Sequence, residues 1–428
     1  MKLSKTLKHP LLKSSLIYTV CDAINKAVPF LILPLLSYYL SPGDYGIIAN
    51  FNVMLSIATI FIMIGVDGAI GVSYYKLNKQ EMSKYVFNGL SLIFGITIII
   101  LFVIILFHDV VNNYIKVPFK YQLWLVLMAF FACITSINLS LWRLEEKAVN
   151  YGIYEILQTI LNIGLSVYLV MYLLNGWEGR VAAMIVASSI FGVFSLFILF
   201  KRGYFRLDTN TKYLKEIIFF GLPIIPHALS FWIRSGVDRI YITNFVGEEA
   251  TGLYATGFQF GVLISFVTYS FNNAFAPYIY KKLSVNDEIE LYNNKKHLVK
   301  ISYLVMFVLI VASVMFTIFS NYFLELFFSD KYIESKDFIF WAILAQTFQG
   351  FYLLFVNYIF FVKKTKLLAV ITFTCSFMQA VLSYFLVKSN GAIGAAYATV
   401  IISFINFILI AFYSNIVCKM PWFYFKKH

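Results

Sequence analysis

Long apolar runs recur from one end of the chain to the other, separated by short polar breaks. A helix needs roughly 20 residues to cross a hydrocarbon core about 30 Å thick. About twelve segments reach that length, at residues 14–40, 45–74, 85–107, 121–142, 153–174, 180–200, 216–246, 250–280, 299–319, 338–362, 367–387 and 392–416. Of the 428 residues 61% are hydrophobic and 13% charged, whereas soluble domains have roughly 45–50% and 25%. We therefore predict an all-α integral membrane protein of about twelve transmembrane helices.

The placement of lysine and arginine predicts the orientation of these helices. Alternate connections fall on the same side, and one side holds both termini and roughly three quarters of the 34 Lys and Arg. Cytoplasmic connections of membrane proteins carry such an excess, so we expect both termini in the cytoplasm. The net charge of +13 is explained by this orientation, and nucleic acid is not expected as a partner.

The spans divide into two halves. We expect an N-terminal six-helix lobe at 1–203, a cytoplasmic linker at 204–215 and a C-terminal six-helix lobe at 216–428. Short matches recur at corresponding places, for example Asn175-Gly and Asn390-Gly. Halves that both begin in the cytoplasm imply a parallel pseudo-repeat, which suits two lobes rocking around a central cavity. Chance similarity between apolar helices is the alternative.

Six charged residues fall inside apolar segments. They are Asp22, Lys26, Asp67, Arg234, Asp238 and Arg239. Each costs about 2.5–3.5 kcal/mol at a helix centre, so such residues usually face a wet cavity or a partner. We expect them to mark a polar substrate cavity. Alternatively, the four-residue spacings Asp22–Lys26 and Arg234–Asp238 form neutral pairs that only stabilise packing.

Prolines interrupt the first helix of each half, at Pro29 and Pro34 and again at Pro223 and Pro226. Proline removes a helical hydrogen bond and kinks the helix. We expect these helices to line the cavity and bend during transport. The alternative is the ordinary tolerance of membrane helices for proline.

Catalytic and metal-binding signatures are missing from the sequence. There is no glycine-rich phosphate loop, His–Glu metal motif or nucleophile elbow. Four cysteines and five histidines are scattered without ligand spacing. We expect no enzyme activity, no metal and no cofactor.

Several segments together resemble the Wzx-type polysaccharide flippases of the multidrug/oligosaccharidyl-lipid/polysaccharide exporter superfamily. The similar segments are residues 25–34, 39–46, 65–75, 221–239, 252–254 and 363–365, in order along the whole chain. The segments of the first and seventh helices are the most specific. The sequence departs from the family at residues 374–379, where an Asn–Leu-Asn pattern is usual.

The resemblance implies a function. Such a protein moves undecaprenyl-pyrophosphate-linked oligosaccharide from the cytoplasmic to the periplasmic leaflet of the bacterial inner membrane, for O-antigen, lipopolysaccharide or capsule synthesis. It implies H+ or Na+ as a coupling ion, with a polysaccharide polymerase and a chain-length regulator as partners. Lys26, Arg234 and Arg239 would attract the pyrophosphate. Asp22, Asp67 and Asp238 would tune those charges, contact sugar or carry the ion.

Three alternatives remain open at this stage. A cation-coupled multidrug exporter of the same fold would favour an acidic cavity. A peptidoglycan-precursor flippase would use the same chemistry on different sugars. A membrane-embedded glycan-processing enzyme is disfavoured because no catalytic constellation is present.

Overall fold

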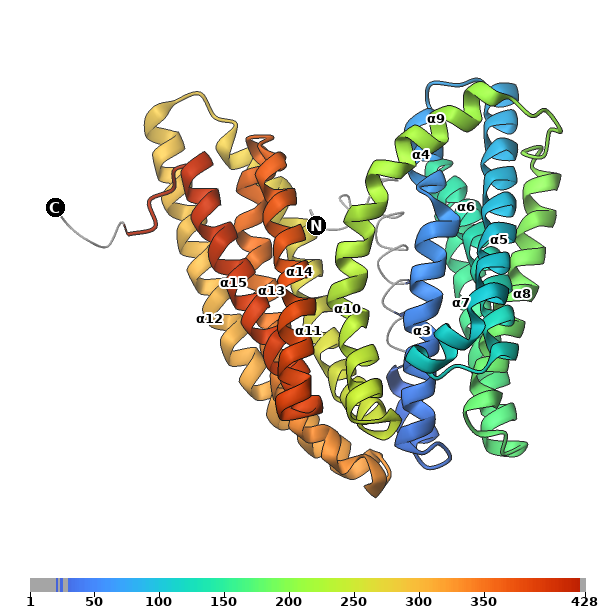
Figure 1. Cartoon of the computed structure of the whole chain (residues 1–428). Coiled ribbons are helices and arrows are strands. Elements are labelled where there is room, and N and C mark those ends of the chain that lie inside the picture. Colours follow the sequence, from blue (N-terminus) through green and yellow to red (C-terminus); the bar gives the residue numbers. More distant parts are fainter. Residues whose placement is uncertain (1–20, 22–23, 26–29, 424–428) are drawn as a thin grey trace, which may run out of the picture. The chain divides into compact units, whose positions relative to one another are not determined.

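The computed structural model describes residue 21, residues 24–25 and residues 30–423, and these residues form helices and connections without a β-strand. The helices of the first part of the chain are α3 (Pro42–Met63), α4 (Val66–Ser73), α5 (Lys79–Ile115), α6 (Phe119–Leu144), α7 (Ala148–Val167), the π-helix η1 (Tyr168–Tyr172), α8 (Gly176–Lys201) and α9 (Thr211–Gly221). They are followed by the 3₁₀ helix η2 (Leu222–Ile224), α10 (Ile225–Phe245), α11 (Glu248–Leu283), α12 (Glu288–Phe327), the 3₁₀ helix η3 (Asp330–Ser335), α13 (Lys336–Phe361), α14 (Thr365–Asn390) and α15 (Ala392–Val417) (Figure 1).

Membrane-spanning length is the common property of these helices. Within the described residues, 11 helical segments are long and apolar enough to cross a bilayer. They correspond to the second to twelfth predicted spans, which confirms the all-α membrane fold. Residues 14–20, 22–23 and 26–29 of the first predicted span, 14–40, lie outside the described residues; residues 30–37 are helical. The cytoplasmic location of both termini stays a prediction.

Residue contacts divide the chain into two compact units, Met1–Gly236 and Val237–His428. The division falls inside α10, later in the chain than the predicted linker at 204–215. The predicted lobe boundaries stay a prediction. The first unit extends beyond the predicted N-terminal lobe because α9, which follows the linker, packs against α4 and α5.

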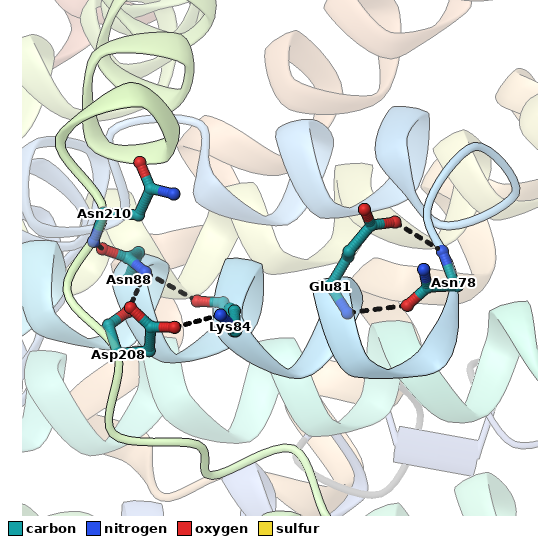
Figure 2. A network of polar contacts seen from close by, with 6 residues as sticks. All are labelled: Asn78, Glu81, Lys84, Asn88, Asp208 and Asn210. Atoms are coloured by element: carbon teal, nitrogen blue, oxygen red, sulfur yellow. Dashed lines mark hydrogen bonds and ion pairs between the residues drawn. The ribbon is translucent and has the colours of Figure 1, made fainter.

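Hydrogen bonds hold the predicted linker against α5 (Figure 2). Asn88 Nδ2 donates to the carbonyl oxygen of Asp208 at 2.8 Å, and the backbone N–H of Asn210 donates to Asn88 Oδ1 at 2.9 Å. Lys84 forms an ion pair with the Asp208 carboxylate. The linker is therefore part of the N-terminal unit.

Two helices extend well beyond the predicted spans. The helix α5 has 37 residues where 85–107 was predicted, and α12 has 40 where 299–319 was predicted. At 1.5 Å per residue each is roughly 55–60 Å long, about twice the hydrocarbon thickness. Phe107, the predicted end of the third span, has non-helical backbone angles inside α5, so the helix kinks there and continues.

A close backbone approach fixes the break between α3 and α4. Ile64 and Gly65 both have positive φ, at 38° and 71°, and end α3 before α4 begins. A Cβ atom on Gly221, the last residue of α9, would lie 1.7 Å from the Ile64 carbonyl oxygen. Only glycine at 221 lets α9 pack this closely against the break.

The C-terminal unit is built around α13. This helix contacts α11, α12 and α15, and α14 packs on α15 (Figure 1). Its buried side chains include Leu354, Phe355 and Tyr358. Small residues close the α14–α15 contact: a Cβ on Gly394 would lie 2.0 Å from the Leu386 carbonyl oxygen.

Candidate functional site

A polar pocket lies inside the N-terminal unit, between membrane helices. Its volume is about 310 Å³, and its lining comes from α4, α6 and α7. The lining residues are Asp67, Ala132, Thr135, Ser136, Leu139, Ser140, Arg143, Tyr151, Glu155 and Gln158. This volume is at the lower end of the range of about 300–1,000 Å³ found for small-molecule sites. Carboxylates, hydroxyls, an amide and a guanidinium thus meet between spans that are otherwise apolar.

The Glu155 carboxylate accepts hydrogen bonds at both of its oxygens. Asn25 Nδ2 donates to Glu155 Oε2 at 2.8 Å, and the Tyr151 hydroxyl donates to Glu155 Oε1 at 3.0 Å. The Thr159 hydroxyl in turn donates to Asn25 Oδ1 at 2.8 Å. Residues four apart share one face of a helix, so Tyr151, Glu155 and Thr159 all point to the same side of α7.

Arg143 stands at the end of the pocket, in the last turn of α6. Its Nη2 donates to the Tyr151 hydroxyl at 3.0 Å, and its guanidinium lies 5.1 Å from the centre of the Tyr151 ring. The Tyr151 hydroxyl therefore connects Arg143 to Glu155.

Asp67 is the predicted site residue that the structure brings into this pocket. It lies in the first turn of α4, directly after the break at Ile64 and Gly65. Its side chain accepts a hydrogen bond from the Gly68 backbone N–H at 2.8 Å and is half-buried. The helix break turns the start of α4 toward the pocket; the role of Asp67 in binding stays a prediction.

Asp238 lies in a second polar cluster, inside the C-terminal unit. Only 3% of the residue is exposed. Asp238 Oδ2 accepts hydrogen bonds from Tyr254 at 3.1 Å, Gln379 at 3.3 Å and Thr399 at 2.8 Å. Its Oδ1 has no hydrogen-bond partner among the described residues. A buried carboxylate with one open oxygen can take a proton or a small cation.

The other predicted charges are not part of the polar pocket. Arg234 and Arg239 are half-buried residues of α10, on either side of the division between the two units. Neither of them lines the pocket. Asp22 and Lys26 lie outside the described residues. Their predicted contribution to substrate binding is therefore untested.

Of the predicted hinge prolines, Pro223 and Pro226 lie at helix ends, whereas Pro34 lies within the helical residues 30–37. Pro223 lies in η2, which separates α9 from α10, and Pro226 lies in the first turn of α10. The carbonyl oxygen of Pro34 accepts a hydrogen bond from the Ser37 hydroxyl at 2.6 Å. Pro29 lies outside the described residues. Bending at these prolines during transport stays a prediction.

Sequence reasoning missed Arg143, Tyr151, Glu155 and Asn25. By its position in the sequence Arg143 belongs to the orienting charges of a cytoplasmic connection, and Glu155 lies within an apolar span. The spacing of polar residues along α7 is the signal that could have found Tyr151 and Glu155. Among the described residues no group of three or more His, Cys, Asp or Glu side chains could hold a metal ion.

The chain is similar in fold to solved membrane transporters. An inward-facing multidrug resistance MATE family transporter of the MOP superfamily matches with a TM-score of 0.74 at 15% identity, covering 93% of this chain and 94% of that one. The lipid II flippase MurJ, in an inward closed conformation, matches with a TM-score of 0.77 at 14% identity, covering 94% of this chain and 87% of that one. The protein thus has the fold of a multi-pass membrane transporter.

The sequence places the chain more closely. It belongs to the family described as polysaccharide biosynthesis protein, whose family model matches residues 11–283. The MatE family model matches residues 223–385. An uncharacterized membrane protein of Haemophilus influenzae is 29% identical over 361 residues, which cover 83% of this chain and 85% of the relative. The resemblance seen in the sequence is thereby confirmed at the level of the family and superfamily.

Proposed function

We infer that this protein is a flippase for undecaprenyl-pyrophosphate-linked oligosaccharides. It moves the repeat units from the cytoplasmic to the periplasmic leaflet of the bacterial inner membrane by alternating access, for O-antigen, lipopolysaccharide or capsule synthesis. The observation that carries this inference is the polar pocket between α4, α6 and α7. Its hydroxyls, carboxylates and guanidinium suit a sugar headgroup next to an anionic phosphate, while the polyprenyl tail stays in lipid.

Membership of the polysaccharide biosynthesis protein family supports the glycan as substrate. The likeness in fold to the lipid II flippase MurJ supports a lipid-linked substrate. Arg234 and Arg239, with Lys26, are the proposed pyrophosphate attractants on the first helix of each half. Asp22 and Asp67 would tune their charge or contact sugar hydroxyls. A polymerase and a chain-length regulator are the proposed protein partners.

Asp238 is the proposed carrier of the coupling ion, H+ or Na+. Support comes from its burial and from the open Oδ1. The buried carboxylate and the neighbouring hydroxyl and amide groups provide oxygen ligands for a small hard cation. Binding of the ion would remove the negative charge from the interior and so favour a different arrangement of α10, α14 and α15.

Deletion of the gene tests the function. We expect undecaprenyl-linked repeat units to accumulate in the cytoplasmic leaflet and surface glycan to disappear, with both defects reversed by the wild-type gene. A deletion strain with normal surface glycan would contradict the proposal. Drug sensitivity with intact glycan would favour the second candidate, a multidrug exporter, which the MatE match and the buried acid of the C-terminal unit support. Arrest of cell-wall synthesis would favour a peptidoglycan-precursor flippase.

A further inference from the structure

The polar face of α7 continues well beyond the pocket. Tyr151, Glu155, Thr159, Asn162 and Ser166 are separated by three or four residues, so they share one side of the helix. We call these five residues the α7 polar face. It extends about 22 Å at 1.5 Å per residue, which is most of a hydrocarbon core about 30 Å thick. The π-helix η1 begins at Tyr168, two residues after Ser166, and the helical spacing of three or four residues ends there.

An arginine lies at each end of the α7 polar face. Arg143 from α6 donates to the Tyr151 hydroxyl at 3.0 Å. Arg180, near the start of α8, donates through Nη1 to both Asn162 Oδ1 and Ser166 Oγ. The residues they bind are 11 to 15 positions apart, so the two cations are separated by roughly half of the hydrocarbon core or more.

What the two arginines can bind depends on their ion-pair partners among the described residues. Within the part of the chain that the structure describes, no carboxylate forms an ion pair with Arg143 or Arg180. Arg180 is half-buried, and both of its hydrogen bonds use one of its three nitrogens. Arg143 is exposed in the last turn of α6, whereas Arg180 lies farther inside its helix, where a charge without an ion-pair partner is expensive and usually marks a ligand path. The remaining guanidinium N–H groups fit a phosphate, which they can bind with two parallel hydrogen bonds.

We propose that the α7 polar face is the track for the glycan headgroup, with Arg143 and Arg180 as the first and second stations for its phosphates. This inference rests on the proposed function and assigns it to particular residues. By the predicted orientation, Arg143 is the cytoplasmic station and Arg180 the periplasmic one. All residues of the track belong to the N-terminal unit.

Hydrogen bonding explains why a continuous track is needed. A sugar hydroxyl that loses water inside the bilayer without a new partner costs several kcal/mol. The α7 polar face offers a polar group about every turn, or roughly every 5.4 Å, which is about the length of one sugar ring. A glycan can therefore exchange partners one turn at a time while its phosphates pass from one arginine to the other.

The test uses the full chain in phosphatidylcholine vesicles, with undecaprenyl diphosphate carrying a short oligosaccharide as the probe. Binding and translocation are measured separately. We expect Arg143→Gln to weaken binding about tenfold, because a charge-assisted hydrogen bond is lost. We expect Arg180→Gln to bind within about twofold of wild type but to translocate about tenfold more slowly. Arg→Lys at either position should recover part of the loss. Arg206→Gln, in the exposed connection before α9, is the matched control and should behave as wild type.

A labelling experiment covers the case in which a Gln variant does not fold. Gln158→Cys places a thiol in the pocket, and the oligosaccharide lipid should slow its alkylation by a maleimide. Thr209→Cys, in the exposed connection, should be alkylated at the same rate with and without the lipid. Equal protection by phosphatidylglycerol would show that the site takes any anionic headgroup, which overturns the assignment to the glycan lipid.

The outcomes separate the track from the function. If wild-type protein translocates the probe and Arg180→Gln does so at the same rate, the track is wrong and the flippase function stands. If Arg143→Gln binds as wild type, the first station is wrong. If wild-type protein translocates no oligosaccharide lipid, both the proposed function and the track are overturned.

Discussion

Arg202 Nη2 lies 2.6 Å from Glu145 Oε1, and this ion pair joins the residue that follows α6 to the residue that follows α8. Both side chains are 14% exposed. Glu145 also pairs with Lys147 at 2.8 Å and accepts a hydrogen bond from Tyr204 at 2.6 Å. Arg202 also donates to Asn138 Oδ1 at 2.7 Å. This cluster fixes the end of the N-terminal unit that contains Arg143.

The first prediction concerns Glu145 and pH. Burial by itself raises the pKa of Glu145, but hydrogen bonds from Lys147, Tyr204 and Arg202 outweigh it and hold the pKa below its ordinary value of 4.5. The carboxylate therefore stabilises the fold above pH 4.5, and this stabilisation is lost as the pH falls from there through the lowered pKa of the folded state. We expect Glu145→Gln to lower the melting temperature at pH 7 and to reduce the acid sensitivity of the wild type.

Removal of one partner from a fully buried pair costs about 3–5 kcal/mol, and the loss here should be smaller because both side chains are 14% exposed. The measurement is thermal unfolding of the detergent-solubilised protein at pH 7 and below pH 4.5. Glu146→Gln, at the exposed neighbouring position, is the control and should leave both curves unchanged. Equal melting temperatures for wild type and Glu145→Gln at pH 7 would contradict the prediction.

The second prediction concerns the close approach at Gly221. Gly221→Ala places a methyl group against the Ile64 carbonyl oxygen and forces α9 away from the α3–α4 break. We expect a loss of about 1–3 kcal/mol in the free energy of unfolding, as for other overpacked sites. Asp67 would shift with the break, so glycan display should fall as well. Gly71→Ala meets nothing within 4 Å and serves as the control for monodispersity and melting temperature.

The third prediction separates ion coupling from folding. Asp238→Asn keeps the shape of the side chain and removes its charge from a buried site, so the melting temperature should stay equal or rise. Transport should lose its dependence on a Na+ or proton gradient, because the open oxygen can no longer take the ion. The measurement is translocation in vesicles with and without each gradient. Asp109→Asn, with a side chain 84% exposed, is the control. A gradient-dependent Asp238→Asn protein would remove Asp238 from coupling.

The fourth prediction concerns the arginines of α10. We expect Arg234→Ala and Arg239→Ala each to abolish surface glycan at normal protein levels, while the lysine variants keep part of it because the charge remains. Glycan on the cell surface is measured by immunoblot beside the amount of protein in the membrane. Arg206→Ala is the control. Wild-type glycan in both alanine variants would show that α10 does not supply the pyrophosphate attractants.

The sequence predicted the fold well, whereas the predicted site residues stay a prediction, and particular residues show why. Eleven of the predicted spans are membrane-length helices, since hydropathy over about 20 residues is a strong local signal. Asp67 was found because a charge in an apolar run stands out. Arg143 and Arg180 were assigned to connections, because position along the chain does not reveal that a residue at a helix end turns back toward a neighbouring helix. The ends of α5 and α12 were missed because their outer turns are polar.

The sequence by itself determined that the protein lies in a membrane, where the described spans lie and to which family the chain belongs. Each of these depends on composition and on the order of residues within a segment. Only the tertiary structure decided which polar side chains meet. Asn25 lies 130 positions before Glu155, and Asp238 shares its cluster with residues 16 to 161 positions away. Hydrogen bonds act over about 3 Å, so such sites exist only once the packing of the helices has brought their polar faces together.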